Sequence, residues 1–280
     1  MSIVLTEKFA ELVDEQFSTA SRKSMVTNND YNWTGAHTVK VYKITTSAMN
    51  NYDRNPKSEN DLSRFGAIKD LDATTEEFTL KKDRSFTFAI DKLDEDETGQ
   101  NLAAATALNR QSREVVIPEV DSYVYGVMTE NAGFKPEPVE ITAADIYERI
   151  TIANSDLDDT EVPEDGRCII VTPKTYVLLK KSRDVILSTD ISDEKRVKGV
   201  VGMIDGCTVI KVPASRLPKD FGFMIAHPCA TVAPTKLEDY RIHKDPPGIS
   251  GSLVEGRICY DAFVLDNKKK AIYYQRAVIN

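Results

Sequence analysis

Residues 199–218 read GVVGMIDGCTVIKVPASRLP, and this run says more about the fold than any other part of the chain. The glycines at 199, 202 and 206 lack the spacing of a phosphate-binding loop, and a strand rather than a helix follows them. A tight β-hairpin is the better interpretation. An apolar strand ending at Ala226 and His227 comes next. The run therefore predicts short strands and tight turns, and it contains no catalytic set.

The segments on both sides of this run also predict alternating short elements. Upstream, residues 162–179 read VPEDGRCIIVTPKTYVLL, which indicates a turn, a buried strand and a helix beginning at Pro173. Before it, Thr142 is expected to cap a short amphipathic helix that contains Ile146 and Ile150. Downstream, TKLEDYR at 235–241 and GRICYDAFVL at 256–265 predict closing strands.

A long helix is expected in the middle of the chain. The run LAAATALNRQSREVV at 102–116 is rich in helix-forming residues, and the acidic residues 91–97 suit the first turns of a helix. Pro118 interrupts the pattern, and proline inside a helix kinks or breaks it. We therefore expect a helix to about Ile117, followed by either a bend or a second helix.

Residues 38–90 predict a long β-hairpin with an elaborate tip. Alternating runs at 38–44, 77–80 and 84–90 enclose a polar excursion at 50–72. An isolated two-stranded ribbon is marginally stable in water. We therefore expect this hairpin to lie across another surface.

The first residues predict an amphipathic helix at 5–17, because its apolar side chains recur at helical spacing. Its apolar stripe has two possible destinations. One is the domain to which the helix belongs, and the other is a neighbouring subunit.

Composition excludes several classes of function. The chain has 280 residues and a net charge of −8, which argues against a surface built to grip nucleic acid. Four cysteines without paired spacing and three scattered histidines predict buried thiols in a reducing compartment, with no metal and no cofactor. The Ser250-Gly251-Ser252 run sits beside a proline-rich loop and does not predict a serine nucleophile. We expect no signal peptide and no membrane span.

In this order, the elements resemble the tailed-phage major capsid proteins of the HK97 fold. The resemblance implies an α+β, HK97-like capsid fold with five parts. These are an N-terminal arm (1–37), a β-hairpin called the E-loop (38–97), a spine helix that starts the P-domain (98–140), an A-domain (141–234) and closing P-domain strands (235–280). It implies a homo-oligomer of pentamers and hexamers that closes into an icosahedral shell around double-stranded DNA, without sequence-specific binding.

The resemblance also implies partners and a location. Scaffold, portal and decoration proteins are the expected partners, and the chain would reside in the host cytoplasm before assembly and in the virion capsid afterwards. The side chains expected at contacts between subunits are Leu5, Phe9, Leu12, Phe17, Trp33, Tyr52, Arg54, Arg64, Phe65, Arg110, Arg113 and Arg241. Two structural alternatives are an encapsulin-like nanocompartment shell and a phage tail protein. A hydrolytic enzyme is the remote alternative.

Overall fold

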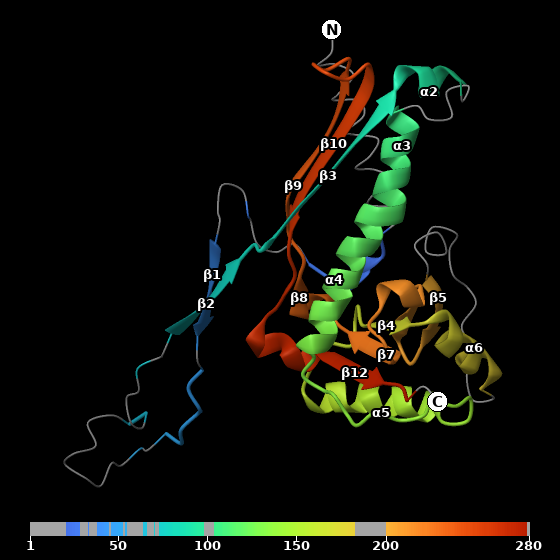
Figure 1. Ribbon diagram of the computed structural model, residues 1–280. Helices are drawn as coiled ribbons and strands as arrows, with labels where there is room; N and C mark the ends of the chain where they lie inside the picture. The colour runs from blue at the N-terminus through green and yellow to red at the C-terminus, as the bar shows by residue number, and fades with distance from the viewer. Residues whose placement is uncertain are drawn as a thin grey trace. The chain divides into compact units, whose positions relative to one another are not determined.

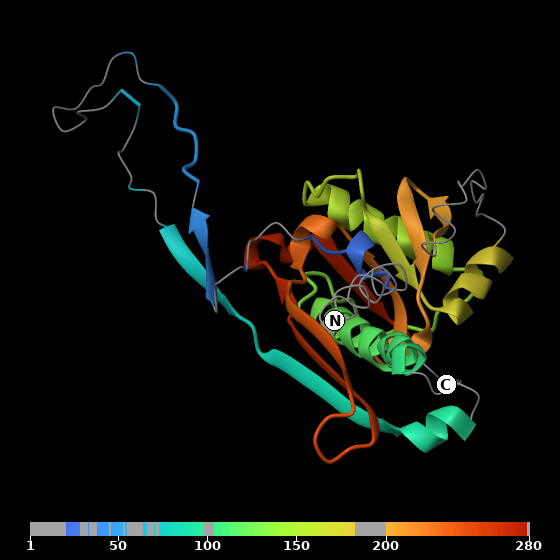
Figure 2. The same ribbon diagram turned by 90° about the horizontal axis from the view of Figure 1, so that it is seen from above.

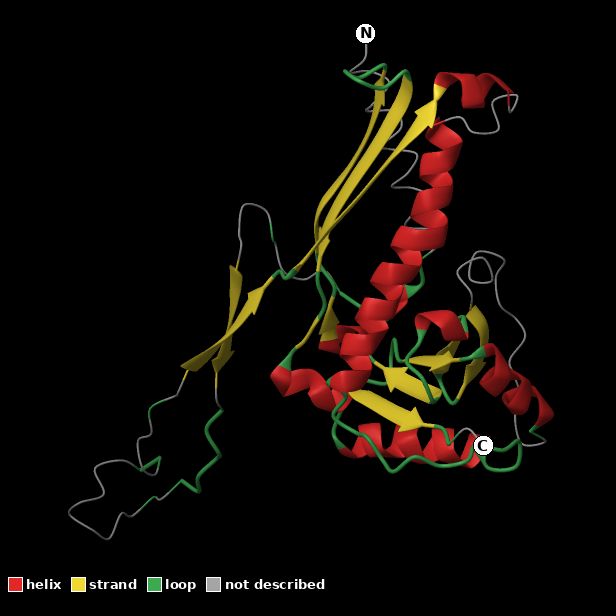
Figure 3. Ribbon diagram, in the orientation of Figure 1, coloured by secondary structure: helices red, strands yellow, loops and turns green. Residues whose placement is uncertain are grey.

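The computed structural model describes residues 21–28, 33, 38–44, 46–52, 54, 64–65, 70, 73–97, 104–182 and 200–278. The chain divides into two units. One is Gly35–Thr79, called here the hairpin unit, and the other comprises the rest of the chain. Figure 1 labels the elements along the chain, and Figure 3 separates helices from strands.

The hairpin unit is a two-stranded antiparallel ribbon. Strand β1 (Thr38–Ile44) pairs with β2 (Ala73–Thr79) along its whole length, from Thr38 opposite Thr79 to Ile44 opposite Ala73. Cross-strand ion pairs join Lys40 to Glu77 and Lys43 to Glu76. The predicted pairing of 38–44 with a strand beyond the polar excursion is confirmed.

The third alternating run of the predicted hairpin belongs elsewhere, and this part of the prediction is wrong. Strand β3 (Lys82–Asp91) pairs with β10 (Gly251–Tyr260), which pairs on its other side with β9 (Thr235–Lys244). The alternation of residues 84–90 predicts a strand correctly but carries no information about its partner. All pairs in this three-stranded sheet are antiparallel.

A five-stranded sheet forms the second half of the larger unit. Its order is β12 (Ile272–Arg276), β7 (Phe221–Ala226), β4 (Cys168–Val171), β6 (Cys207–Lys211) and β5 (Val200–Ile204). Strands β4 and β6 run parallel, and the other neighbours are antiparallel.

The turn between β5 and β6 confirms the hairpin predicted from residues 199–218. Asp205 and Gly206 both have positive φ, at 49° and 74°. This is the conformation of a two-residue hairpin turn, which glycine adopts without strain.

Helices cover both faces of the five-stranded sheet. Alternate strand residues, such as Ile170 and Met224, pack in one apolar cluster with α4 (Ile117–Glu130). The intervening residues, such as Ile169 and Ile225, pack in another with α5 (Ile146–Asp159). Figure 2 shows the two helices on opposite sides of the sheet. Because β4 is buried on both faces, all four of its residues are apolar.

The long central helix is continuous through Pro118. It consists of α3 (Ala104–Gln111), a π-helical turn η2 (Ser112–Val116) and α4. The amide of Ile117 donates to the carbonyl oxygen of Ser112, five residues back. A proline ring clashes with the carbonyl four residues before it, and a wider π-helical turn relieves that clash. At Pro118, where a bend or a second helix was expected, the chain instead shows a local change of helix type.

The remaining elements are short. They are α2 (Lys92–Glu97), α6 (Pro173–Lys181), the pair β8 (Thr231–Val232) and β11 (Phe263–Val264), and the 3₁₀ turns η1 (Lys23–Met25), η3 (Ala214–Arg216), η4 (Pro228–Ala230) and η5 (Asp266–Ala271). Helix α6 begins where predicted, since the Thr172 hydroxyl accepts the amide of Thr175 at 3.1 Å.

The segment 21–28 is part of the body of the larger unit. Val26 is fully buried in the cluster beneath α4, and the Asn28 amide donates to the carbonyl oxygen of Thr231 at 2.9 Å. The helix predicted at 5–17 lies outside the described residues. The five domain boundaries stay predictions.

Candidate functional site

The connection between β1 and β2 carries an exposed aromatic pair. Tyr52 and Phe65 meet edge to face with ring centroids 5.1 Å apart, yet they are 51% and 76% exposed. The side-chain amide of Asn50 donates to the Phe65 carbonyl oxygen at 3.3 Å. The structure thus brings together two side chains that the sequence assigned to contacts between subunits. Arg54 and Arg64, from the same connection, are also exposed.

The other predicted arginines lie on the surface of the larger unit. Arg110 is on α3 and Arg113 on the π-helical turn, and both are exposed. Arg241 on β9 forms a two-bond ion pair with Asp239, with Nη2 to Oδ2 at 2.7 Å. The contact roles of these three arginines stay predictions.

Trp33 is held within its own chain. Only 6% of it is exposed, and its ring stacks on Phe263 of β11 with centroids 5.6 Å apart. This packing gives the residue a role inside the subunit, whereas its contact between subunits stays a prediction. The predicted contact residues that lie outside the described residues are Leu5, Phe9, Leu12 and Phe17.

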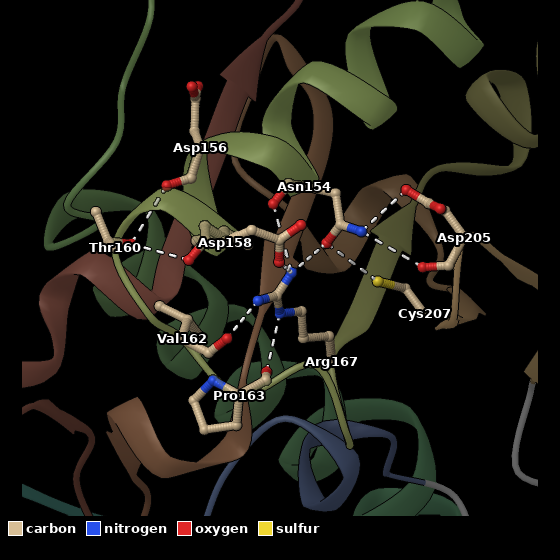
Figure 4. A network of polar contacts seen from close by, with 10 residues as sticks. Asn154, Asp156, Asp158, Thr160, Val162, Pro163, Arg167, Asp205 and Cys207 are labelled. Atoms are coloured by element: carbon tan, nitrogen blue, oxygen red, sulfur yellow. Dashed lines mark hydrogen bonds and ion pairs between the residues drawn. The ribbon is translucent and has the colours of Figure 1, made fainter.

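A fully buried arginine forms the densest polar network of the larger unit (Figure 4). The side chain of Arg167 is 0% exposed, and its Nη1 lies 2.6 Å from Oδ1 of Asp158 at the end of α5. Its Nε donates to the Pro163 carbonyl at 2.9 Å, and Nη2 donates to that of Val162. Nη1 also donates to Oδ1 of Asn154 at 2.5 Å. A planar guanidinium suits this many acceptors, because it offers five donors in a fixed fork.

The same network extends to the β5–β6 turn. The side-chain amide of Asn154 donates to Oδ2 of Asp205 at 3.0 Å, and the Cys207 thiol lies 3.5 Å from Oδ1 of Asn154. Arg167 therefore fixes three surface segments against one another, namely the end of α5, the turn at 160–166 and the β5–β6 turn. Sequence reasoning missed this role, because an arginine preceding a strand ordinarily points to solvent.

A second buried group anchors the start of the described chain. The Ser21 hydroxyl donates to Oδ1 of Asp121 on α4 at 2.7 Å, and Arg216 approaches Oδ2 at 2.9 Å. Burial raises the pKa of the Asp121 carboxyl, and the Ser21 hydrogen bond and the Arg216 charge oppose part of that rise. The contacts tie residues 21–28 to the long helix.

Metal-ligating and thiol side chains are the next feature of the described residues. Among them, no group of three or more His, Cys, Asp and Glu side chains is placed to hold a metal ion. The thiols of Cys168 and Cys207 are buried, and burial raises their pKa values to about 12 and about 11, so they are protonated near neutral pH. Within the described residues, no helix is both long and apolar enough to cross a bilayer.

Comparison with known proteins identifies the fold. No family model and no curated protein sequence matches the chain. Among solved structures, the capsid of cyanophage P-SCSP1u superposes with a TM-score of 0.68 at 12% identity, covering 91% of this chain and 87% of that one. The mature capsid of bacteriophage PhiM1 gives 0.63 at 13%, covering 91% and 85%. A virus-like particle from Pyrococcus furiosus gives 0.57 at 13%, covering 97% and 99%. The predicted α+β fold is confirmed, and the chain has the HK97-like fold of phage capsid subunits.

Proposed function

We propose that the chain is the major capsid protein of a tailed phage, and that its copies self-assemble into an icosahedral head around double-stranded DNA. The observation that carries the proposal is the extent of the structural match. Capsid chains of two phages align with 91% of this chain over 85–87% of their own length. The likeness therefore extends over most of the chain rather than over one shared domain.

The hairpin unit supports a structural role in an assembly. A two-stranded ribbon is marginally stable alone in water, and this one exposes the aromatic pair Tyr52 and Phe65. A neighbouring copy would cover these rings and stabilise the two-stranded ribbon. The net charge of −8 fits the inner wall of a container for nucleic acid, because like charges repel. Scaffold, portal and decoration partners belong to this proposal, as does residence in the virion.

Expression of the full chain followed by size-exclusion chromatography and negative-stain electron microscopy tests the proposal. Closed shells, or rings of five and six subunits, are the expected products, with co-expression of a scaffold from the neighbouring genes if the chain alone stays monomeric. A product that remains monomeric under both conditions would refute the proposal.

Phe65 offers a sharper test of the hairpin unit. Phe65→Ser should leave the folded subunit unchanged, because the ring is 76% exposed, but should impair assembly. Leu93→Ser, at another apolar side chain that is 65% exposed, is the matched control and should assemble normally. Deletion of residues 50–72 should give the same folded but assembly-defective subunit. Normal shells from both hairpin variants would contradict the proposed role of this unit.

A nanocompartment shell is the second candidate. The observation favouring it is the match to the Pyrococcus furiosus virus-like particle, which covers 97% of this chain and 99% of that chain. The contents of purified particles distinguish the two candidates. Nuclease-protected DNA in particles from the native source would support the phage head, whereas a protein cargo without DNA would support the nanocompartment.

A further inference from the structure

The parallel pairing of β4 and β6 defines two opposite edges of the five-stranded sheet. Cys168 pairs with Thr208 and Val171 with Lys211, so residues just before either strand lie at one edge and residues just after lie at the other. At about 3.3 Å per residue, strands of this length separate the edges by more than 10 Å. Around β4, β5 and β6, the charged side chains at the two edges differ in sign.

The first edge, called here the acidic edge, comprises the end of α5, the turn before β4 and the β5–β6 turn. Its exposed carboxylates are Asp158, Asp159, Glu161, Glu164, Asp165 and Asp205. At this edge Arg167 is buried and paired with Asp158, and the His227 ring contacts the Asp165 carbonyl oxygen at 2.9 Å. The network around Arg167 holds these segments in place, so the carboxylates occupy fixed positions rather than a loose loop.

The second edge, called here the basic edge, comprises α6 and the end of β6. Its lysines are Lys174, Lys180, Lys181 and Lys211. The amines of Lys180 and Lys211 lie 5.2 and 5.5 Å from the centre of the same ring, that of Tyr176. The two ammonium groups lie against the same ring and repel each other. An incoming anionic group would relieve that repulsion. Within the described part of the chain, no carboxylate forms an ion pair with these four lysines.

We propose that the acidic edge of one copy docks against the basic edge of the next copy, in a head-to-tail contact. The proposal rests on the proposed function, and it adds which surfaces meet and with which polarity. A two-fold contact that placed each edge against itself would oppose like charges, and a reciprocal two-fold contact would stop at a dimer. A head-to-tail contact pairs opposite charges at every junction, and repetition of a single such contact closes a ring.

Each edge also has an apolar side chain that a partner could cover. Val177 on α6 is 49% exposed, and Met203, two residues before Asp205, is 41% exposed. A contact with apolar side chains surrounded by charged ones is typical of protein interfaces. The apolar part would contribute area and the charges would select the orientation.

Charge reversal tests the polarity. Lys180→Glu with Lys181→Glu cancels the net positive charge of the basic edge, and Asp159→Lys with Glu164→Lys replaces two carboxylates of the acidic edge by lysines. Each pair should raise the protein concentration needed for assembly by about tenfold or more, with the circular dichroism and melting of the unassembled subunit unchanged. The fourfold variant exchanges the charges at these four positions, so it should assemble at a lower protein concentration than either pair alone.

A matched control separates the site from the overall charge. Lys92→Glu with Lys244→Glu, at exposed positions on α2 and β9, changes the net charge by the same amount as the Lys180 and Lys181 pair and should assemble normally. Assembly should also weaken with added salt in the wild type.

Three results would overturn the inference while leaving the proposed function intact. These are normal assembly of either charge-reversed pair, failure of the fourfold variant to recover, and an equal defect in the control. A wild-type chain that never forms rings or shells, even with a scaffold, would instead refute the proposed function, and this inference with it.

Discussion

Replacing Arg167 with methionine should destabilise the subunit by about 3–5 kcal/mol. The change removes a side chain with 0% exposure that donates to the carbonyl oxygens of Val162 and Pro163 and to Asn154. Each buried acceptor left without a donor costs about 1–3 kcal/mol, and this change leaves three such acceptors. Methionine fills a similar volume, so little of the loss would come from a cavity.

Urea unfolding of the unassembled subunit, followed by circular dichroism, measures this loss as a lower midpoint at an unchanged slope. The urea midpoint of Arg167→Lys should lie between those of the wild type and Arg167→Met, because a single ammonium group cannot reproduce the planar fork of the guanidinium. Asp158→Asn should also lower the midpoint, because it leaves the buried guanidinium without the carboxylate that it pairs with, although its carbonyl acceptors remain. An Arg167→Met variant within about 1 kcal/mol of wild type would refute the reasoning.

Two further predictions concern packing and pH. Gly256→Val should lower the urea midpoint, because a Cβ at this position would lie 2.3 Å from the ring of Phe86. Gly126→Ala should raise the midpoint slightly, because a Cβ there would have nothing within 4 Å. Equal effects of the two changes would contradict this prediction. Buried Cys168 and Cys207 keep their protons up to pKa values of about 12 and about 11, while an unfolded thiol loses its proton near pH 8.5, so stability should fall as the pH rises above about 8.5. Unfolding at pH 8 and pH 10 checks this, and a double alanine variant with an equally steep decline would count against the thiols as the cause.

Local signals in the sequence predicted elements well where one residue type decides the conformation. Glycine at 206 indicated the β5–β6 hairpin, and Pro173 marked the first turn of α6. Pro118 correctly marked an irregularity in the helix, but its form, a π-helical turn, depends on how the helix packs along its whole length.

The sequence pattern did not predict which strands and side chains would contact one another. The alternation of residues 84–90 is the same whether the strand completes a hairpin or joins β10, since period-two patterns fix the faces of a strand and not its neighbour. Arg167 was missed for a related reason. Its acceptors come from α5 and from backbone carbonyls of the turn at 160–166, and backbone carbonyls leave no trace in a sequence pattern.

The Asp261 side chain has a mechanical consequence. A pull transmitted along the chain from β2 enters the larger unit at residues 80–82, where β3 begins opposite Tyr260, the last residue of β10. Force applied at this end of the β3–β10 pair would break its hydrogen bonds one after another. Asp261 accepts the amide of Lys81 and the hydroxyl of Tyr123 at that very end, at 2.8 and 2.7 Å. Asp261 therefore links the first residues of the β3–β10 pair to the long helix. Force passes into the body of the subunit instead of separating β3 from β10.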